Sequence, residues 1–128
     1  MSDDELNPEI RGWWRITSTS QWVDDGLDIL GPAMLSITGY TDRVRMHCLL
    51  AYVNVKPTKT GASFICEGAC EYDQMTGTGS VRIGKDGTLR GRFQIRNGDG
   101  STFIAMRAAA PAEPIPRPPS YRDKWRRR

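Results

Sequence analysis

The segment from Leu89 to Arg96 alternates apolar and polar residues without a break, and it restricts the fold more than any other feature of the chain. One face carries Leu89, Gly91, Phe93 and Ile95, which are apolar apart from the glycine. The other face carries the polar residues Arg90, Arg92, Gln94 and Arg96. A period of two is that of a β-strand with one buried face. Hairpin signals, Lys85-Asp86-Gly87 and Asn97-Gly98-Asp99-Gly100, flank the segment. The segment is therefore predicted to be a strand between two tight turns.

Similar patterns recur along most of the chain. Strands are predicted at 10–19, 34–40, 43–55, 64–72, 81–83, 89–95 and 102–107. Their connections are short, and no helical segment is long enough for a parallel crossover. These features predict an all-β fold, a small antiparallel up-and-down β-barrel of seven or eight strands, because closure removes exposed edges. A half-open roll and a sandwich are the alternatives.

The 128 residues fit one domain. We expect a lead-in over residues 1–9, the barrel over 10–110 and a flexible, basic, proline-rich tail over 111–128. The tail has six basic residues against two acidic ones, a charge of +4. Residues 1–110 carry −1, which gives the net charge of +3. Its predicted anion-binding residues are Arg122, Lys124, Trp125, Arg126, Arg127 and Arg128. The partner would be nucleic acid or an acidic protein surface. A proline-rich ligand for an aromatic groove and a merely solvating tail are the alternatives.

Three cysteines form an odd set, and the acidic N-terminus lacks the layout of an export signal. We therefore expect reduced thiols in a cytoplasmic protein without a membrane span. Cys66, Cys70, His47 and Cys48 are residue types that bind zinc. Residues four apart on a strand lie about 13 Å apart, however, too far to bind one ion. No metal and no cofactor are predicted.

The first strand begins with Gly12-Trp13-Trp14, and alternation places Gly12, Trp14 and Ile16 on one face. This stretch resembles the glycine-x-tryptophan signature of lipocalins and related calycins. The resemblance implies that the tryptophan, here Trp14, packs against a basic residue late in the last strand, here Arg107, and closes the barrel.

A second resemblance covers residues 10–107. There the chain is similar to a group of small uncharacterised bacterial proteins with a tryptophan-rich first strand, an aspartate-glycine-proline loop and an acidic fourth strand. The matching residues are Trp14, Trp22, Asp28, Gly31, Pro32, Phe64, Glu67, Gly68, Glu71, Asp73, Gly77, Gly79, Gly87, Gly91, Phe103, Ala105 and Arg107. This resemblance implies one compact domain and brings no activity with it.

Three functions remain open from the sequence. The first is a non-enzymatic binding module that holds a small apolar or amphipathic ligand at the barrel mouth, near the loop 21–32. Its predicted ligand-binding residues are Trp22, Tyr52, Phe64 and Phe93. The second is an interaction protein whose barrel is filled and whose tail binds an anionic partner.

The third function, an enzyme, would use surface carboxylates of the fourth strand and the turn after it, namely Glu67, Glu71 and Asp73. An ionic ladder is the simpler account of these residues, because an outward row of arginines is expected on the neighbouring strands, at Arg82, Arg90, Arg92 and Arg96. That row could also follow phosphate groups. No catalytic residue is predicted.

Overall fold

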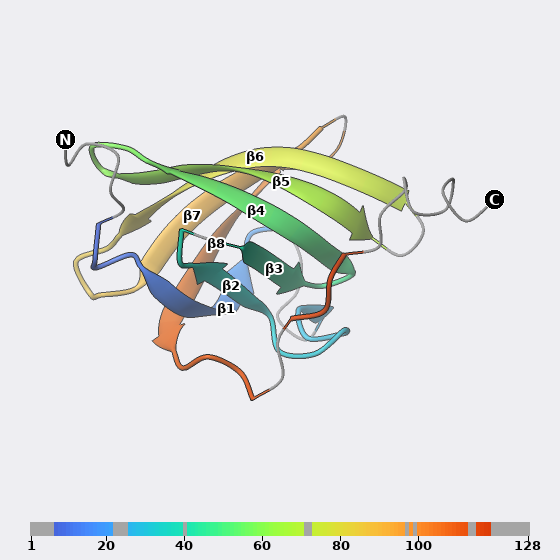
Figure 1. Cartoon of the computed structure of the whole chain (residues 1–128), viewed down its shortest axis with the longest axis horizontal. Helices are drawn as coiled ribbons and strands as arrows, with labels where there is room; N and C mark the ends of the chain where they lie inside the picture. Colours follow the sequence, from blue (N-terminus) through green and yellow to red (C-terminus); the bar gives the residue numbers. More distant parts are fainter. Residues whose placement is uncertain are drawn as a thin grey trace.

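The computed structural model describes residues 7–21, 26–39, 41–70, 73–96, 98, 100–112 and 115–118. They form a closed barrel in which each strand pairs with the next and β8 pairs with β1 (Figure 1). The strands are β1 (Gly12–Thr19), β2 (Met34–Ile37), β3 (Asp42–Met46), β4 (Leu49–Pro57), β5 (Gly61–Cys70), β6 (Asp73–Ile83), β7 (Leu89–Ile95) and β8 (Gly100–Ala108). All pairings are antiparallel. The predicted all-β, up-and-down barrel is confirmed.

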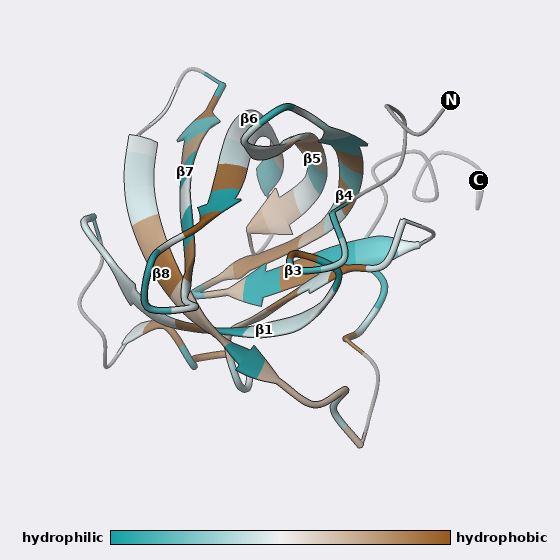
Figure 2. Ribbon diagram, turned by 90° about the vertical axis from the view of Figure 1, so that its left-hand side faces the viewer, coloured by the Kyte–Doolittle hydropathy of each residue, from teal (hydrophilic) through white to brown (hydrophobic). Residues whose placement is uncertain are grey.

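The two ends of the barrel carry different connections. The β1–β2 loop and the β3–β4, β5–β6 and β7–β8 turns lie at one end, which we call the loop end. The chain enters β1 and leaves β8 at the other, which we call the seam end. Bands of apolar and polar residues alternate along the strands, as the period of two requires (Figure 2).

The predicted third strand is two strands. It breaks at His47, whose backbone takes the left-handed conformation with φ of 55°, and β3 pairs back onto β4 with Val44 opposite Ala51. The turn reverses the inside–outside assignment of the second half of that predicted strand, which is β4. Ala51 and Val53 belong to the core, so Tyr52, which was predicted to bind a ligand of the barrel, lies on the outer face.

Large aromatic side chains fill the barrel by lying over the glycines directly opposite them on the neighbouring strand. A Cβ atom on Gly79 would lie 2.3 Å from the Phe64 ring, and one on Gly91 would lie 2.2 Å from the Phe103 ring. An apolar cavity of about 20 Å³ lies in the interior, among Ile16, Leu35, Phe64 and Phe93. Such a volume accommodates about one water molecule and no organic ligand.

A disulfide joins Cys48, in the β3–β4 turn, to Cys70 at the end of β5, with their Cα atoms 4.8 Å apart. The expectation of three reduced thiols is therefore wrong for this pair. The turn at His47 brings Cys48 beside the end of β5, and the strand pattern did not indicate that turn. Cys66 is the free thiol and is buried in the core. Desolvation raises the pKa of the Cys66 thiol, which keeps it protonated.

The outer face of β2 and β3 is covered rather than solvated. Arg45 donates from Nε to the carbonyl of Pro32 at 2.9 Å, which holds the β1–β2 loop against β3. Ile115 is 2% exposed, and its carbonyl accepts a hydrogen bond from Arg43. Figure 1 shows residues 115–118 running beside β3. This contact was not anticipated, because a proline-rich composition predicts extended chain but not where that chain packs.

Candidate anion-binding surface

The predicted closure residues meet at the seam end. Trp14 and Arg107 are directly opposite in the β1–β8 register, and the Arg107 guanidinium lies 4.2 Å from the centroid of the fully buried Trp14 ring. The same guanidinium donates to the carbonyls of Glu9 and Arg11. The predicted Trp14–Arg107 contact is confirmed, and it lies where β1 and β8 pair to close the barrel.

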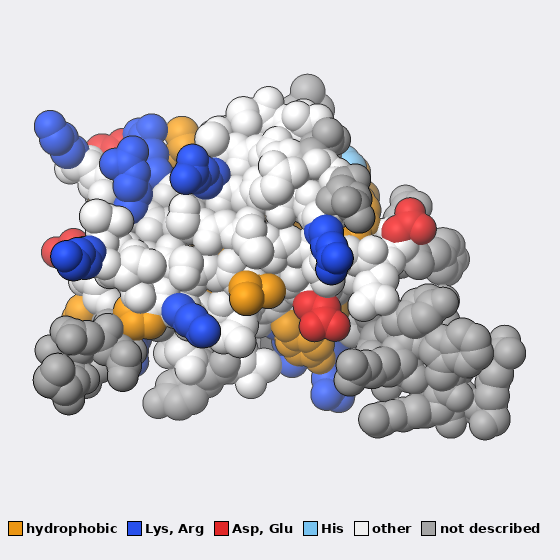
Figure 3. All heavy atoms as spheres, turned by 90° about the horizontal axis from the view of Figure 1, so that it is seen from above, with side chains coloured by type: hydrophobic (Ala, Val, Ile, Leu, Met, Phe, Trp, Pro, Cys, Tyr) orange, Lys and Arg blue, Asp and Glu red, His pale blue; other side chains and the backbone are white. Residues whose placement is uncertain are grey.

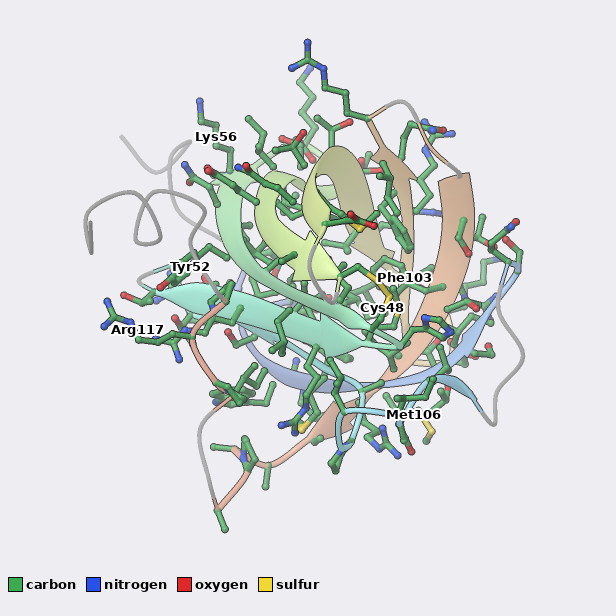
Figure 4. All side chains as sticks on the ribbon, turned by 90° about the vertical axis from the view of Figure 1, so that its right-hand side faces the viewer. Cys48, Tyr52, Lys56, Phe103, Met106 and Arg117 are labelled. Atoms are coloured by element: carbon green, nitrogen blue, oxygen red, sulfur yellow. A yellow bond between two sulfur atoms is a disulfide. The ribbon has the colours of Figure 1, made fainter. Side chains whose placement is uncertain are left out.

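The four residues predicted to bind a ligand are not brought together. Phe64 and Phe93 face the small interior cavity from β5 and β7. Tyr52 lies on the outer wall, where the Arg43 guanidinium carbon is 5.7 Å from its ring centroid. Figure 4 shows Tyr52 outside the barrel, whereas Phe103 points inward. Trp22 lies outside the described residues.

The loop end of the barrel is closed by the described part of the β1–β2 loop. Leu27 is 2% exposed and belongs to the core, and its carbonyl accepts a hydrogen bond of 2.8 Å from the backbone of His47. Asp28 binds the Arg15 guanidinium through both carboxylate oxygens and accepts a bond from the backbone N–H of Ala33. These bonds hold the loop across the end where a ligand was expected to enter.

The acidic residues proposed for catalysis or for a ladder lie apart from the arginines. Glu67 of β5 is opposite Thr76, and Asp73 is opposite Cys70. Over the described ranges, Glu67 forms no ion pair, so the predicted ladder is wrong for this residue. Glu71 lies outside the described residues. The alternation had identified the faces correctly but not the register between strands.

The outward arginines instead form rows with neutral polar residues across three strands. In one row Ser80 of β6, Arg92 of β7 and Thr102 of β8 are directly opposite one another. In the next row Arg82 of β6 is opposite Arg90 of β7. We call these five residues the arginine surface. All of them are exposed except Ser80, which is half-buried.

Little negative charge lies near the arginine surface. Arg90 contacts Asp86 at 3.3 Å in the turn between β6 and β7. The Thr88 hydroxyl, with help from Arg90, lowers the pKa of the Asp86 carboxyl, so this charge persists at neutral pH. Among the described residues, no carboxylate lies within ion-pairing distance of Arg82 or Arg92. Figure 3, which shows the molecule from above, has Lys and Arg side chains gathered toward the upper left.

Two solvent-open hollows lie along this outer wall. One, of about 510 Å³, includes Arg82, Arg90 and Arg92 in its lining, and the other, of about 620 Å³, continues toward Gln94 and Gly100. Ser80, Arg92 and Thr102 line both hollows, which therefore meet at that row. Neither lining contains an acidic residue. The two hollows are thus lined by basic and neutral residues.

The sequence had indicated only part of this surface. The alternation placed Arg90 and Arg92 outward, and Arg82 was assigned to the same side of its own strand. The alternation does not predict the β6–β7 register, which places Arg82 directly opposite Arg90. The short β6–β7 turn, with Gly87 at φ +82°, fixes that register and was the one available signal.

The remaining predictions concern residues and groups away from this surface. The anion-binding tail residues, 122 and 124–128, lie outside the described residues. Within the described ranges, no three His, Cys, Asp or Glu side chains gather as metal ligands would. The same ranges contain no helix with the length and apolarity that a membrane span requires.

A scan against protein-family models and searches of curated proteins and of solved structures return no match for this chain. The likenesses to calycins and to small bacterial proteins therefore remain resemblances in sequence. Any function has to be argued from the barrel and its surfaces.

Proposed function

We propose that this protein is a non-enzymatic interaction module that binds an anionic partner on the outer wall of a filled barrel. The sequence left two non-enzymatic functions open: a barrel that holds a small ligand, and a filled barrel that acts as an interaction protein. The interior cavity of about 20 Å³ favours the second alternative, the filled barrel. A pocket for a small organic ligand is typically more than tenfold larger.

The observation that carries the proposal is the placement of Arg82 directly opposite Arg90. Like charges on opposite residues of neighbouring strands destabilise a sheet. Asp86 compensates Arg90, whereas Arg82 and Arg92 have no acidic partner among the described residues. An anion bound between these guanidiniums would relieve the repulsion, and guanidinium groups form forked bonds to carboxylate, phosphate and sulfate oxygens.

The tail adds positive charge to the same chain. Residues 111–128 carry +4, whereas residues 1–110 carry −1. Basic residues interleaved with Tyr121 and Trp125 are typical of segments that bind anionic partners. Under this proposal the tail and the arginine surface contribute separately, and their contributions can be measured separately. A small ligand at the barrel mouth remains a prediction without a described site.

Retention on a heparin column tests the proposal, since heparin is a polyanion with no base to recognise. The full chain should elute above the salt concentration that elutes a neutral barrel, and Arg82→Gln with Arg92→Gln should lower that concentration. Arg11→Gln, which removes an exposed charge at the seam end, serves as the control and should change elution little. Equal elution of the double variant and the wild type would overturn the role of the arginine surface.

A further inference from the structure

We infer that the partner of the arginine surface is a nucleic acid, held by its phosphodiester backbone without readout of base sequence. This inference rests on the proposed function and narrows its partner to one class. It concerns the residues of β6, β7 and β8 that line the two joined hollows, and it makes no use of the tail.

The chemistry of the surface favours phosphate over carboxylate side chains of a protein. The outward positions supply guanidinium and hydroxyl donors, from Arg82, Arg92, Ser80 and Thr102. These side-chain types make most protein contacts to phosphate and sugar oxygens. Arg90 and Arg92 are two residues apart on one strand, so they repeat at about 6.7 Å along the surface.

A protein partner would be expected to find an exposed aromatic or methionine anchor, and neither hollow has one; the apolar side chain opposite Arg90 is Ile104, which is half-buried. The large exposed apolar side chains of the described residues are Ile29, Leu30, Ile65 and Met106, and none of them lines either hollow. Protein interfaces usually bury aromatic residues or methionine at their core. The central row here is Ser80, Arg92 and Thr102 instead.

The same surface has no aromatic side chain exposed for base stacking. Phe93 and Phe103 lie under it and are 8% and 4% exposed, because both face the barrel interior. Modules that select single-stranded sequences stack bases on exposed aromatic rings. Binding here would therefore depend on charge and hydroxyl contacts to the backbone. It would be strongly salt-dependent and indifferent to base identity.

The hollows run roughly parallel to β7, from Arg90 past Gln94. Four residues of strand span about 13 Å, so the surface contacts a short stretch of backbone. DNA and RNA share the phosphodiester group, and so do single strands and duplexes. The experiment has to compare these forms.

Fluorescence anisotropy of the full chain with labelled oligonucleotides tests the inference. The probes are a 15-nucleotide thymidine DNA, a 15-nucleotide uridine RNA, a mixed-sequence single strand and a 15-base-pair duplex, each titrated at several salt concentrations. At least one form should bind with affinity that falls linearly with salt on a logarithmic scale. Among single strands, the thymidine and mixed-sequence DNA should bind equally, within about twofold.

Arg82→Gln with Arg92→Gln should weaken binding of every form that the wild type binds, by a similar factor. It should also reduce the salt slope by about 1.4 for single strands, because each phosphate contact contributes about 0.7. Arg11→Gln should leave the affinity and the slope near wild type. Arg92→Lys should retain most of the slope, since it keeps the charge. This last variant also separates loss of charge from loss of fold, which thermal unfolding checks directly.

Failure of the inference can be told apart from failure of the proposed function. A tail variant that combines Arg126→Gln, Arg127→Gln and Arg128→Gln makes the comparison. If it loses oligonucleotide binding while Arg82→Gln with Arg92→Gln binds like the wild type, the inference is overturned and binding belongs to the tail. Heparin or polyglutamate binding that needs Arg82 and Arg92, without oligonucleotide binding, would overturn the nucleic-acid partner and leave the proposed function standing. No binding to any polyanion would overturn both.

Discussion

The guanidinium of Arg107 on the last strand lies over the indole ring of Trp14 on the first, 4.2 Å from the ring centroid. Three further contacts hold this pair. Trp14 donates from Nε1 to the carbonyl of Ile10 at 2.7 Å, and Arg107 donates to the carbonyls of Glu9 and Arg11. A side chain at Gly12 would place its Cβ 2.5 Å from the same guanidinium. The seam between β1 and β8 is thus fixed by one cluster of side chain and backbone.

Trp14→Ala should destabilise the protein by about 3–5 kcal/mol, as removal of a large buried aromatic residue does. Trp13→Ala should cost less, because Trp13 is only half-buried on the outer face. Urea unfolding of the two variants measures both costs. Equal costs, or a larger cost at Trp13, would contradict the role of Trp14 at the seam.

Gly91→Ala should destabilise the barrel by about 1–3 kcal/mol, the usual range for overpacking a core. The added methyl group would meet the Phe103 ring at 2.2 Å, and Phe103 is packed inside the barrel. Gly84→Ala is the matched control, since its nearest neighbours are the flexible side chains of Asp86 and Arg90. Denaturant midpoints that coincide for the two variants would show that the interior is loosely packed.

Loss of the Cys48–Cys70 disulfide should cost about 3 kcal/mol, the chain-entropy value for a loop of 22 residues. A phosphine reductant should lower the melting temperature of the wild type and should have no effect on Cys48→Ser with Cys70→Ser. Thiol titration of the unfolded, unreduced protein should find one thiol, that of Cys66. Three thiols, with no response to reductant, would mean that the bond does not form in the isolated protein.

The stability of the protein should depend on Asp28 in a pH-dependent way. Hydrogen bonds from Arg15 hold the pKa of the Asp28 carboxyl below its usual range. A lowered pKa in the folded state stabilises the protein above the unfolded pKa, near 3.9, and this stabilisation is lost as pH falls through the folded value. Since the pair is exposed, the effect should be at most about 1 kcal/mol.

Urea unfolding between pH 2 and pH 7 measures that dependence. Asp28→Asn should be less stable than wild type at pH 7, and the difference should shrink below about pH 4. Asp73→Asn, at an exposed position of β6, provides the comparison and should show a small difference throughout. If the stability difference between Asp28→Asn and wild type stays constant across this pH range, the charge of Asp28 does not contribute to stability.

Much of the barrel could be predicted, because period-two alternation is a local signal. β7 was placed from Leu89 to Ile95 by its own residues, and the buried face of β1 followed from Gly12, Trp14 and Ile16. The closure partner Arg107 came from the calycin resemblance, and the β1–β8 register bears it out.

The errors arose where a long-range or special backbone feature overrides the local pattern. His47 has no sequence feature that requires a positive φ, so the β3–β4 turn was missed and Tyr52 was assigned to the wrong face. The disulfide was missed for the same reason, since the turn brings Cys48 beside Cys70. The arginine surface needed the β6–β7 register, which pairs Arg82 with Arg90 and no carboxylate.

The central claim, an anion-binding outer wall, is tested most directly by NMR of the arginine side chains. The Nε–H signals of the full chain, labelled with nitrogen-15, would be assigned through Arg82→Gln, Arg92→Gln and Arg11→Gln and followed during titration with the thymidine oligonucleotide. The account predicts that the signals of Arg82 and Arg92 shift and saturate together, while that of Arg11 stays in place. Signals of Arg82 and Arg92 that remain unmoved while the oligonucleotide binds would contradict it.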